Sequence, residues 1–67
     1  MDITLNGEQK TLTTDMTDVQ RLLTSLNLEP QTLVVELNHR ILAPDEYATT
    51  SLNDGDIIEL VHFVGGG

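Results

Sequence analysis

The stretch MDITLNGEQKTLT, residues 1–13, predicts a β-hairpin at the start of the chain. Polar and apolar residues alternate in its first half, which is typical of a strand with one buried face. Ile3 and Leu5 would lie on that face. Asn6-Gly7 then predicts a tight turn, because both residues tolerate a positive φ angle. The return strand occupies the remainder of the stretch, with Leu12 directed inward.

A helix is predicted after the hairpin, over about residues 18–26. Its four apolar residues recur at helical spacing and would form one buried stripe. These residues are Val19, Leu22, Leu23 and Leu26. Thr17 is the expected N-cap, with Asp18 in the first turn, where a negative charge favours the helix dipole. Asn27 and Pro30 end the helix.

Three further strands are predicted over residues 33–37, 40–42 and 57–63, with a helical turn over 44–47 and a tight turn over 53–56. Alternation assigns one set of strand residues to the interior. This inward set contains Leu33, Val35, Leu37, Ile58 and Leu60. The outward set contains Val34, Glu36, Glu59, Val61 and Phe63. Leu52 is a single apolar anchor between the last two turns.

This order of elements predicts an α+β domain in two layers, with one main helix covering a mixed sheet of four to five strands. The first and last strands would lie parallel at the centre of the sheet. This is the β-grasp arrangement, which ubiquitin also has. We expect residues 1–63 to form the domain and residues 64–67 to form a flexible tail.

The composition excludes several classes of partner and site. The chain has 67 residues, with 3 Lys or Arg and 11 Asp or Glu, giving a net charge of −8. This balance argues against nucleic acid and against anionic membranes, which both require a basic surface. Cysteine is absent, which excludes disulfides and thiolate metal sites. The start lacks the features of a signal peptide and no apolar run is long enough to span a membrane, so we expect a cytoplasmic protein.

The side chains do not form a recognisable catalytic or metal-binding motif. Ser25 and Ser51 lie outside any nucleophile-elbow context, and His39 and His62 are too far apart in sequence for ligand-like spacing. Asp54-Gly55-Asp56 faintly resembles part of a calcium loop, but the rest of that motif is missing, and a turn is the better interpretation. We therefore expect neither an enzyme nor a metal site.

The three glycines Gly65, Gly66 and Gly67 carry the clearest functional signal. A glycine tail presents no Cβ, so it could enter a channel too narrow for any side chain. Its last carboxylate would be an acyl donor once an enzyme had adenylated it. A frayed end or a remnant of cloning is the alternative, because chain termini are commonly disordered.

A family resemblance runs through the whole chain and is densest at its end. It is carried by Asn6-Gly7, Leu22-Leu23, Val35-Glu36-Leu37-Asn38, Ile41, Pro44 and the final run DGDIIELVHFVGGG, residues 54–67. In these residues the chain resembles the ThiS family, the ubiquitin-like sulfur carriers of thiamine biosynthesis.

The resemblance implies that Gly67 is the modified residue, with Gly65 and Gly66 in its tail. A ThiF-type adenylating enzyme would activate Gly67 with ATP and magnesium, and the carrier itself would bind no cofactor. A sulfur donor such as a cysteine desulfurase relay would convert the adenylate to a thiocarboxylate. Thiazole synthase, ThiG, would then receive the sulfur. The free carrier is expected to be a monomer.

An outward apolar patch next to the tail is the predicted docking site. It contains Val61 and Phe63, with Val34 on the adjacent strand, and large aromatic residues are enriched at interfaces. Glu59 lies beside the patch and would steer the carrier towards basic partners. Ordinary surface exposure is the alternative for the apolar residues.

Three other functions remain open from the sequence. A molybdopterin-type sulfur carrier, MoaD-like, shares the fold and the ending. A ubiquitin-like protein modifier would join its tail to a lysine. A β-grasp interaction module with an inert tail would lose nothing on removal of Gly66 and Gly67.

Overall fold

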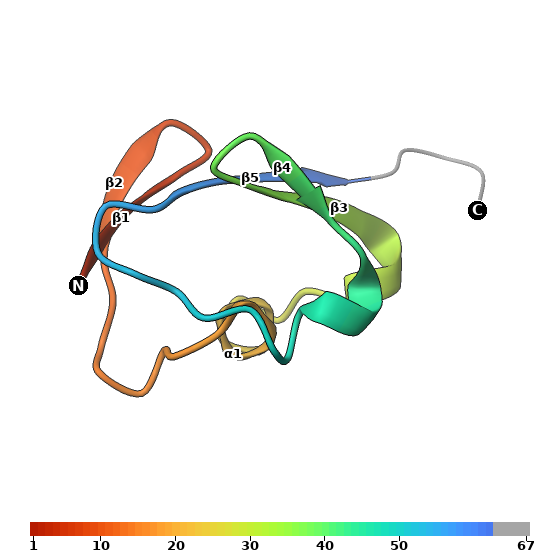
Figure 1. The fold of residues 1–67 in the computed structure, drawn as a ribbon, viewed down its shortest axis with the longest axis horizontal. Coiled ribbons are helices and arrows are strands. Elements are labelled where there is room, and N and C mark those ends of the chain that lie inside the picture. Colours follow the sequence, from red (N-terminus) through yellow and green to blue (C-terminus); the bar gives the residue numbers. More distant parts are fainter. Residues whose placement is uncertain (63–67) are drawn as a thin grey trace.

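The computed structural model describes residues 1–62, which form a five-stranded mixed sheet with one α-helix against one of its faces (Figure 1). The strands are β1 (Asp2–Leu5), β2 (Glu8–Thr11), β3 (Leu33–Leu37), β4 (Arg40–Leu42) and β5 (Ile57–His62). The helix is α1 (Val19–Ser25), and two 3₁₀ turns, η1 (Pro30–Thr32) and η2 (Pro44–Glu46), flank β3 and β4. The β-grasp prediction is confirmed.

The strand order β2-β1-β5-β3-β4 places β5 at the centre of the sheet. It pairs in parallel with β1, where Leu5 lies opposite Ile58, and antiparallel with β3, where Val35 lies opposite Leu60. The final strand therefore holds the two halves of the sheet together. The predicted parallel pairing of the first and last strands is correct.

Two tight turns explain why the outer strands fold back on their neighbours. Asn6 and Gly7 have φ angles of 49° and 82°, and Asn38 and His39 have φ angles of 50° and 70°. Positive φ at both central residues is what a type I′ hairpin turn requires, and this turn matches the twist of the flanking strands. The return strand of the first hairpin is shorter than predicted, because β2 ends at Thr11.

The ends of α1 are fixed by specific caps. Asp18, and not Thr17 as predicted, is the N-cap, because its carboxylate accepts a hydrogen bond from the Arg21 amide at 2.8 Å. At the other end Asn27 adopts a φ of 58°, and the amide of Leu28 donates to the Leu23 carbonyl at 3.0 Å. This pattern is a Schellman motif, which satisfies carbonyls that the helix leaves free.

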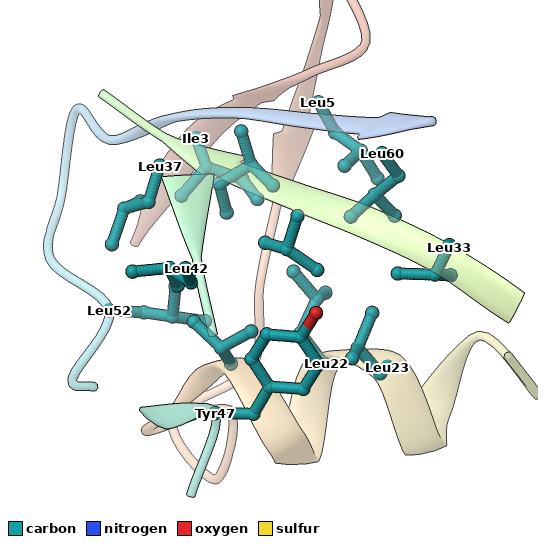
Figure 2. Packing of buried hydrophobic residues seen from close by; sticks show 13 residues of the cluster. Ile3, Leu5, Leu22, Leu23, Leu33, Leu37, Leu42, Tyr47, Leu52 and Leu60 are labelled. Atoms are coloured by element: carbon teal, nitrogen blue, oxygen red, sulfur yellow. The ribbon is translucent and has the colours of Figure 1, made fainter. Parts of the chain in front are cut away.

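The core lies between α1 and the inner face of the sheet, and it matches the predicted inward set. Its buried apolar residues are Ile3, Leu5, Val19, Leu22, Leu23, Leu33, Val35, Leu37, Leu42, Tyr47, Leu52, Ile58 and Leu60. Figure 2 shows the Tyr47 ring among leucines that come from both the helix and the sheet. Leu12 and Leu26 pack against this cluster while remaining partly exposed. None of the helices within residues 1–62 is long and apolar enough to cross a membrane.

A buried carboxylate ties the start of β5 to the β3–β4 turn. Asp56 accepts hydrogen bonds from the Asn53 amide at 2.7 Å and from the Asn38 side-chain amide at 3.0 Å. The Asn38 side-chain oxygen in turn accepts from the Ile57 amide at 2.9 Å. These bonds compensate for the loss of water around Asp56 and fix the point at which β5 enters the sheet.

Glu46 makes the stability of the η2 region depend on pH. Its carboxylate accepts from the Ala43 amide at 2.8 Å and from the Arg40 guanidinium at 3.3 Å. The Ala43 hydrogen bond first, and then Arg40, hold the pKa of Glu46 below its ordinary value. A carboxyl group with a lowered folded-state pKa stabilises the fold above its ordinary pKa, and this contribution is lost as the pH falls through the lowered value.

We therefore expect wild-type protein to be more stable than Glu46→Gln at neutral pH. The difference in unfolding free energy should shrink as the pH falls through the lowered pKa of Glu46, because the carboxyl group then becomes protonated in the folded as well as the unfolded state. Urea unfolding of both proteins at several pH values measures this. A difference that stays constant with pH would show that the charge of Glu46 does not contribute.

Candidate functional site

The outer face of the sheet carries the candidate docking residues, because α1 covers only the opposite face (Figure 1). Val34 on β3 lies directly opposite Val61 on β5, and Glu36 lies opposite Glu59. Val61 is 59% exposed, whereas Val34 and Glu59 are half-buried. The structure thus brings Val34, Glu59 and Val61 together as predicted. Phe63 and the tail glycines Gly65, Gly66 and Gly67 lie outside the described residues.

Two isoleucines enlarge this apolar face beyond the residues predicted from the sequence. Ile41 on β4 lies opposite Glu36 and is 67% exposed, and Ile57 begins β5 with 38% exposure. For Ile57 the alternation along β5 was the available signal, since Ile58 beside it faces the core. Val34, Ile41, Ile57 and Val61 together are called the outer-face patch below.

A shallow apolar hollow of about 190 Å³ adjoins the outer-face patch at the β4 edge. Val34 and Ile41 belong both to the patch and to the lining of the hollow. Pro30 and Pro44, from the two 3₁₀ turns, also line the hollow. The apolar surface therefore continues from the sheet face around its edge. An interface larger than the patch itself has room to form here.

The charges on the outer face are negative. Glu36 and Glu59 face each other across β3 and β5, and like charges in that position repel each other. The exposed imidazole of His39 lies near Glu36, with its Nδ1 3.8 Å from the carboxylate. An apolar surface interrupted by two carboxylates matches a partner surface that combines apolar and basic groups.

The two histidines of residues 1–62, His39 and His62, both lie exposed on the surface. In the described part of the chain, no three or more His, Asp or Glu side chains are placed to hold a metal ion. The candidate site therefore consists of a surface for a partner and the glycine tail that follows β5 in the sequence.

A family model, similar sequences and solved structures all relate this chain to the same family of proteins. The model of the ThiS family matches residues 3–67. The sulfur carrier protein ThiS of Bacillus subtilis is 43% identical over 63 residues, which cover 94% of this chain and 96% of that protein. A thiazole synthase of Paramagnetospirillum magneticum is 39% identical over 67 residues, covering all of this chain but only 20% of the synthase. The chain thus spans about a fifth of that relative's length.

Solved structures agree with the fold. The crystal structure of the thiamine biosynthesis protein ThiS from Geobacter metallireducens superposes with a TM-score of 0.85 at 33% sequence identity, and the match covers both chains completely. The solution structure of a thiamine biosynthesis protein from the same organism gives a TM-score of 0.81 and covers 88% of that chain.

Proposed function

Because the chain belongs to the ThiS family of sulfur carriers, we propose that Gly67 holds the sulfur as a thiocarboxylate and delivers it to a thiazole synthase. The observation that carries this proposal is the family match, which runs to the last glycine of the sequence. The thiazole synthases that contain a segment similar to this chain support the identity of the recipient.

Loading of the sulfur requires two steps, because a carboxylate is a poor electrophile. In the first, a carboxylate oxygen of Gly67 attacks the α-phosphorus of ATP and displaces pyrophosphate, which gives an acyl-adenylate. A ThiF-type partner would bind the ATP and Mg²⁺ for this step. In the second, hydrosulfide attacks the acyl carbon and expels AMP, which leaves the thiocarboxylate. If the donor is instead a persulfide on a cysteine desulfurase relay, its outer sulfur would attack, AMP would leave, and a thiol would then reduce the acyl disulfide to release the thiocarboxylate and a new disulfide.

In this chemistry the carrier presents its terminal carboxylate to the partner enzymes and supplies no catalytic side chain. A thiocarboxylate is an anion at neutral pH and a soft nucleophile, so it is ready to attack an electrophilic carbon once the recipient has bound the tail. Covalent attachment also keeps the sulfur from diffusing away as sulfide. Since adenylation consumes ATP, we further propose that the carrier works in the cytoplasm.

We propose that the adenylating enzyme binds to the outer-face patch and to Phe63. Replacing Val61 or Phe63 with Ala should raise the Kd for that enzyme about tenfold, because truncation of an apolar anchor at an interface commonly costs more than 1 kcal/mol. Titration calorimetry with an adenylation-deficient form of the enzyme would measure it.

Gln9→Ala is the matched control for the docking prediction. Gln9 is exposed and lies opposite Thr4 on β1, on the same side of the sheet but at the β2 edge, where β1 separates it from Ile57 and from the Val61 end of β5. Its Kd should equal that of the wild type. Equal Kd values for all three variants, with unchanged unfolding curves, would remove the outer face from the interface.

Complementation tests the proposed function in cells. The intact chain should restore growth without thiamine to a Bacillus subtilis strain that lacks its own ThiS. If the chain instead restores a strain that lacks the molybdopterin sulfur carrier, the result would point to that pathway. Higher-mass conjugates that disappear when Gly66 and Gly67 are removed would point to a protein modifier, and each of these results would overturn the thiazole assignment.

A further inference from the structure

Asn6 makes a contact that its position in a hairpin turn does not require. Its side-chain oxygen, Oδ1, accepts a hydrogen bond from the backbone amide of Leu60 at 2.7 Å. The two residues are separated by 54 positions in the sequence: Asn6 directly follows β1, and Leu60 lies on β5, the strand beside β1. Glycine also tolerates the positive φ of this position, so the turn by itself does not require an amide side chain.

The Asn6–Leu60 hydrogen bond continues the row of hydrogen bonds between β1 and β5 beyond the last backbone pair. The Thr4 amide donates to the Asp56 carbonyl and the Asn6 amide to the Ile58 carbonyl, both at 2.9 Å. The paired register of the two strands ends at Leu5 opposite Ile58. At Asn6 the chain turns into the hairpin with a φ of 49°, and the side-chain oxygen serves as the next acceptor along β5.

The location of this contact connects it to the tail. Leu60 is in the second half of β5, which ends at His62, and the sequence continues directly to the glycines at 65–67. On one side this half of β5 pairs with β3, as far as His62 opposite Leu33. On the β1 side, the Asn6 side chain anchors Leu60 beyond the last backbone pair.

We propose that Asn6 is a positioning residue for sulfur loading: it fixes the second half of β5 and so sets the path along which the carrier presents Gly67 to the adenylating enzyme. The proposal rests on the proposed function. It acts through the backbone of β5, and Asn6 itself is not expected to touch ATP or the sulfur donor.

Two substitutions separate the role of Asn6 as a hydrogen-bond acceptor from its role in the turn. Asn6→Gly permits the positive φ but removes the oxygen, whereas Asn6→Asp keeps an oxygen acceptor and still tolerates the left-handed region. In Asn6→Gly the Leu60 amide should exchange with solvent about tenfold faster relative to the Thr4 amide, which reports the same strand pair. Asn6→Asp should restore the wild-type ratio.

The catalytic readout uses a reconstituted ThiF-type enzyme, ATP, Mg²⁺ and a sulfide source, with the intact carrier as substrate. Asn6→Gly should lower kcat for thiocarboxylate formation several-fold with little change in KM, because the docking face is unchanged while fewer bound carriers present the tail correctly. Asn6→Asp should recover most of the lost kcat. Thermal unfolding of each variant confirms that the folded form is assayed.

Two results would overturn the proposal, and they differ in what they imply. If Leu60 exchange rises in Asn6→Gly while kcat and KM stay at wild-type values, the bond is purely structural. If the wild-type carrier itself gains no sulfur with an active enzyme, the proposed function fails, and the positioning role fails with it.

Discussion

Gly66→Val should reduce thiocarboxylate formation at Gly67 about a hundredfold or more. Adenylation requires the terminal carboxylate to reach the α-phosphate of ATP inside a partner enzyme, and a misplacement of about 1 Å at such a step costs on that order. Valine adds a branched side chain directly before the reacting residue and restricts its backbone. The initial rate of sulfur loading, followed by intact-protein mass spectrometry, measures the effect.

Gln9→Val is the control for this substitution. It introduces the same side chain at an exposed position of β2, where valine is a favourable strand residue, and it should load sulfur at the wild-type rate. The Kd of Gly66→Val for the adenylating enzyme should change little if docking depends on the sheet face. A wild-type loading rate for Gly66→Val would mean that the tail does not enter a narrow channel.

Ile58→Ala should destabilise the fold more than any surface substitution in the sheet. Ile58 is fully buried at the centre of the sheet, opposite Leu5 on one side and Leu37 on the other. Truncation of such a residue costs about 2–5 kcal/mol, and a domain of this length has about 3–10 kcal/mol of stability in total. The variant should therefore lose more than about 10 °C in Tm.

The neighbouring residue supplies a matched control on the same strand. Ile57 is 38% exposed and points to the outer face, so Ile57→Ala should cost about 1.5 kcal/mol, less than Ile58→Ala. Thermal unfolding followed by circular dichroism compares the two variants. Equal losses would contradict the assignment of Ile58 to the core and Ile57 to the surface.

The elements of this fold could be predicted because their signals are local. Asn6-Gly7 specifies its turn by backbone chemistry alone, and alternation on β3 and β5 assigns each residue to a face. The N-cap of α1 is a feature that local sequence signals could not predict. Thr17 and Asp18 are both good caps, and the choice depends on tertiary contacts, since the Thr17 carbonyl accepts from the Leu52 amide at 3.1 Å.

The candidate site was predictable where it depends on strand register and not where it depends on distant contacts. Val34 and Val61 follow from two neighbouring strands with known inward residues. Ile41 belongs to a strand of three residues, which is too short for a pattern to assign its face. The bond from Asn6 to Leu60 joins residues 54 positions apart and becomes visible only when β1 and β5 are placed side by side.

The most direct test of the central claim is intact-protein mass spectrometry of the chain with a free carboxylate on Gly67. The protein would be incubated with a ThiF-type enzyme, ATP, Mg²⁺ and a sulfur source, and compared with the same mixture lacking ATP. We expect a mass gain equal to the exchange of one oxygen for sulfur, located on Gly67 by fragmentation and absent without ATP. An unchanged mass, with an enzyme that loads the Bacillus subtilis ThiS in parallel, would contradict the proposal that Gly67 carries sulfur.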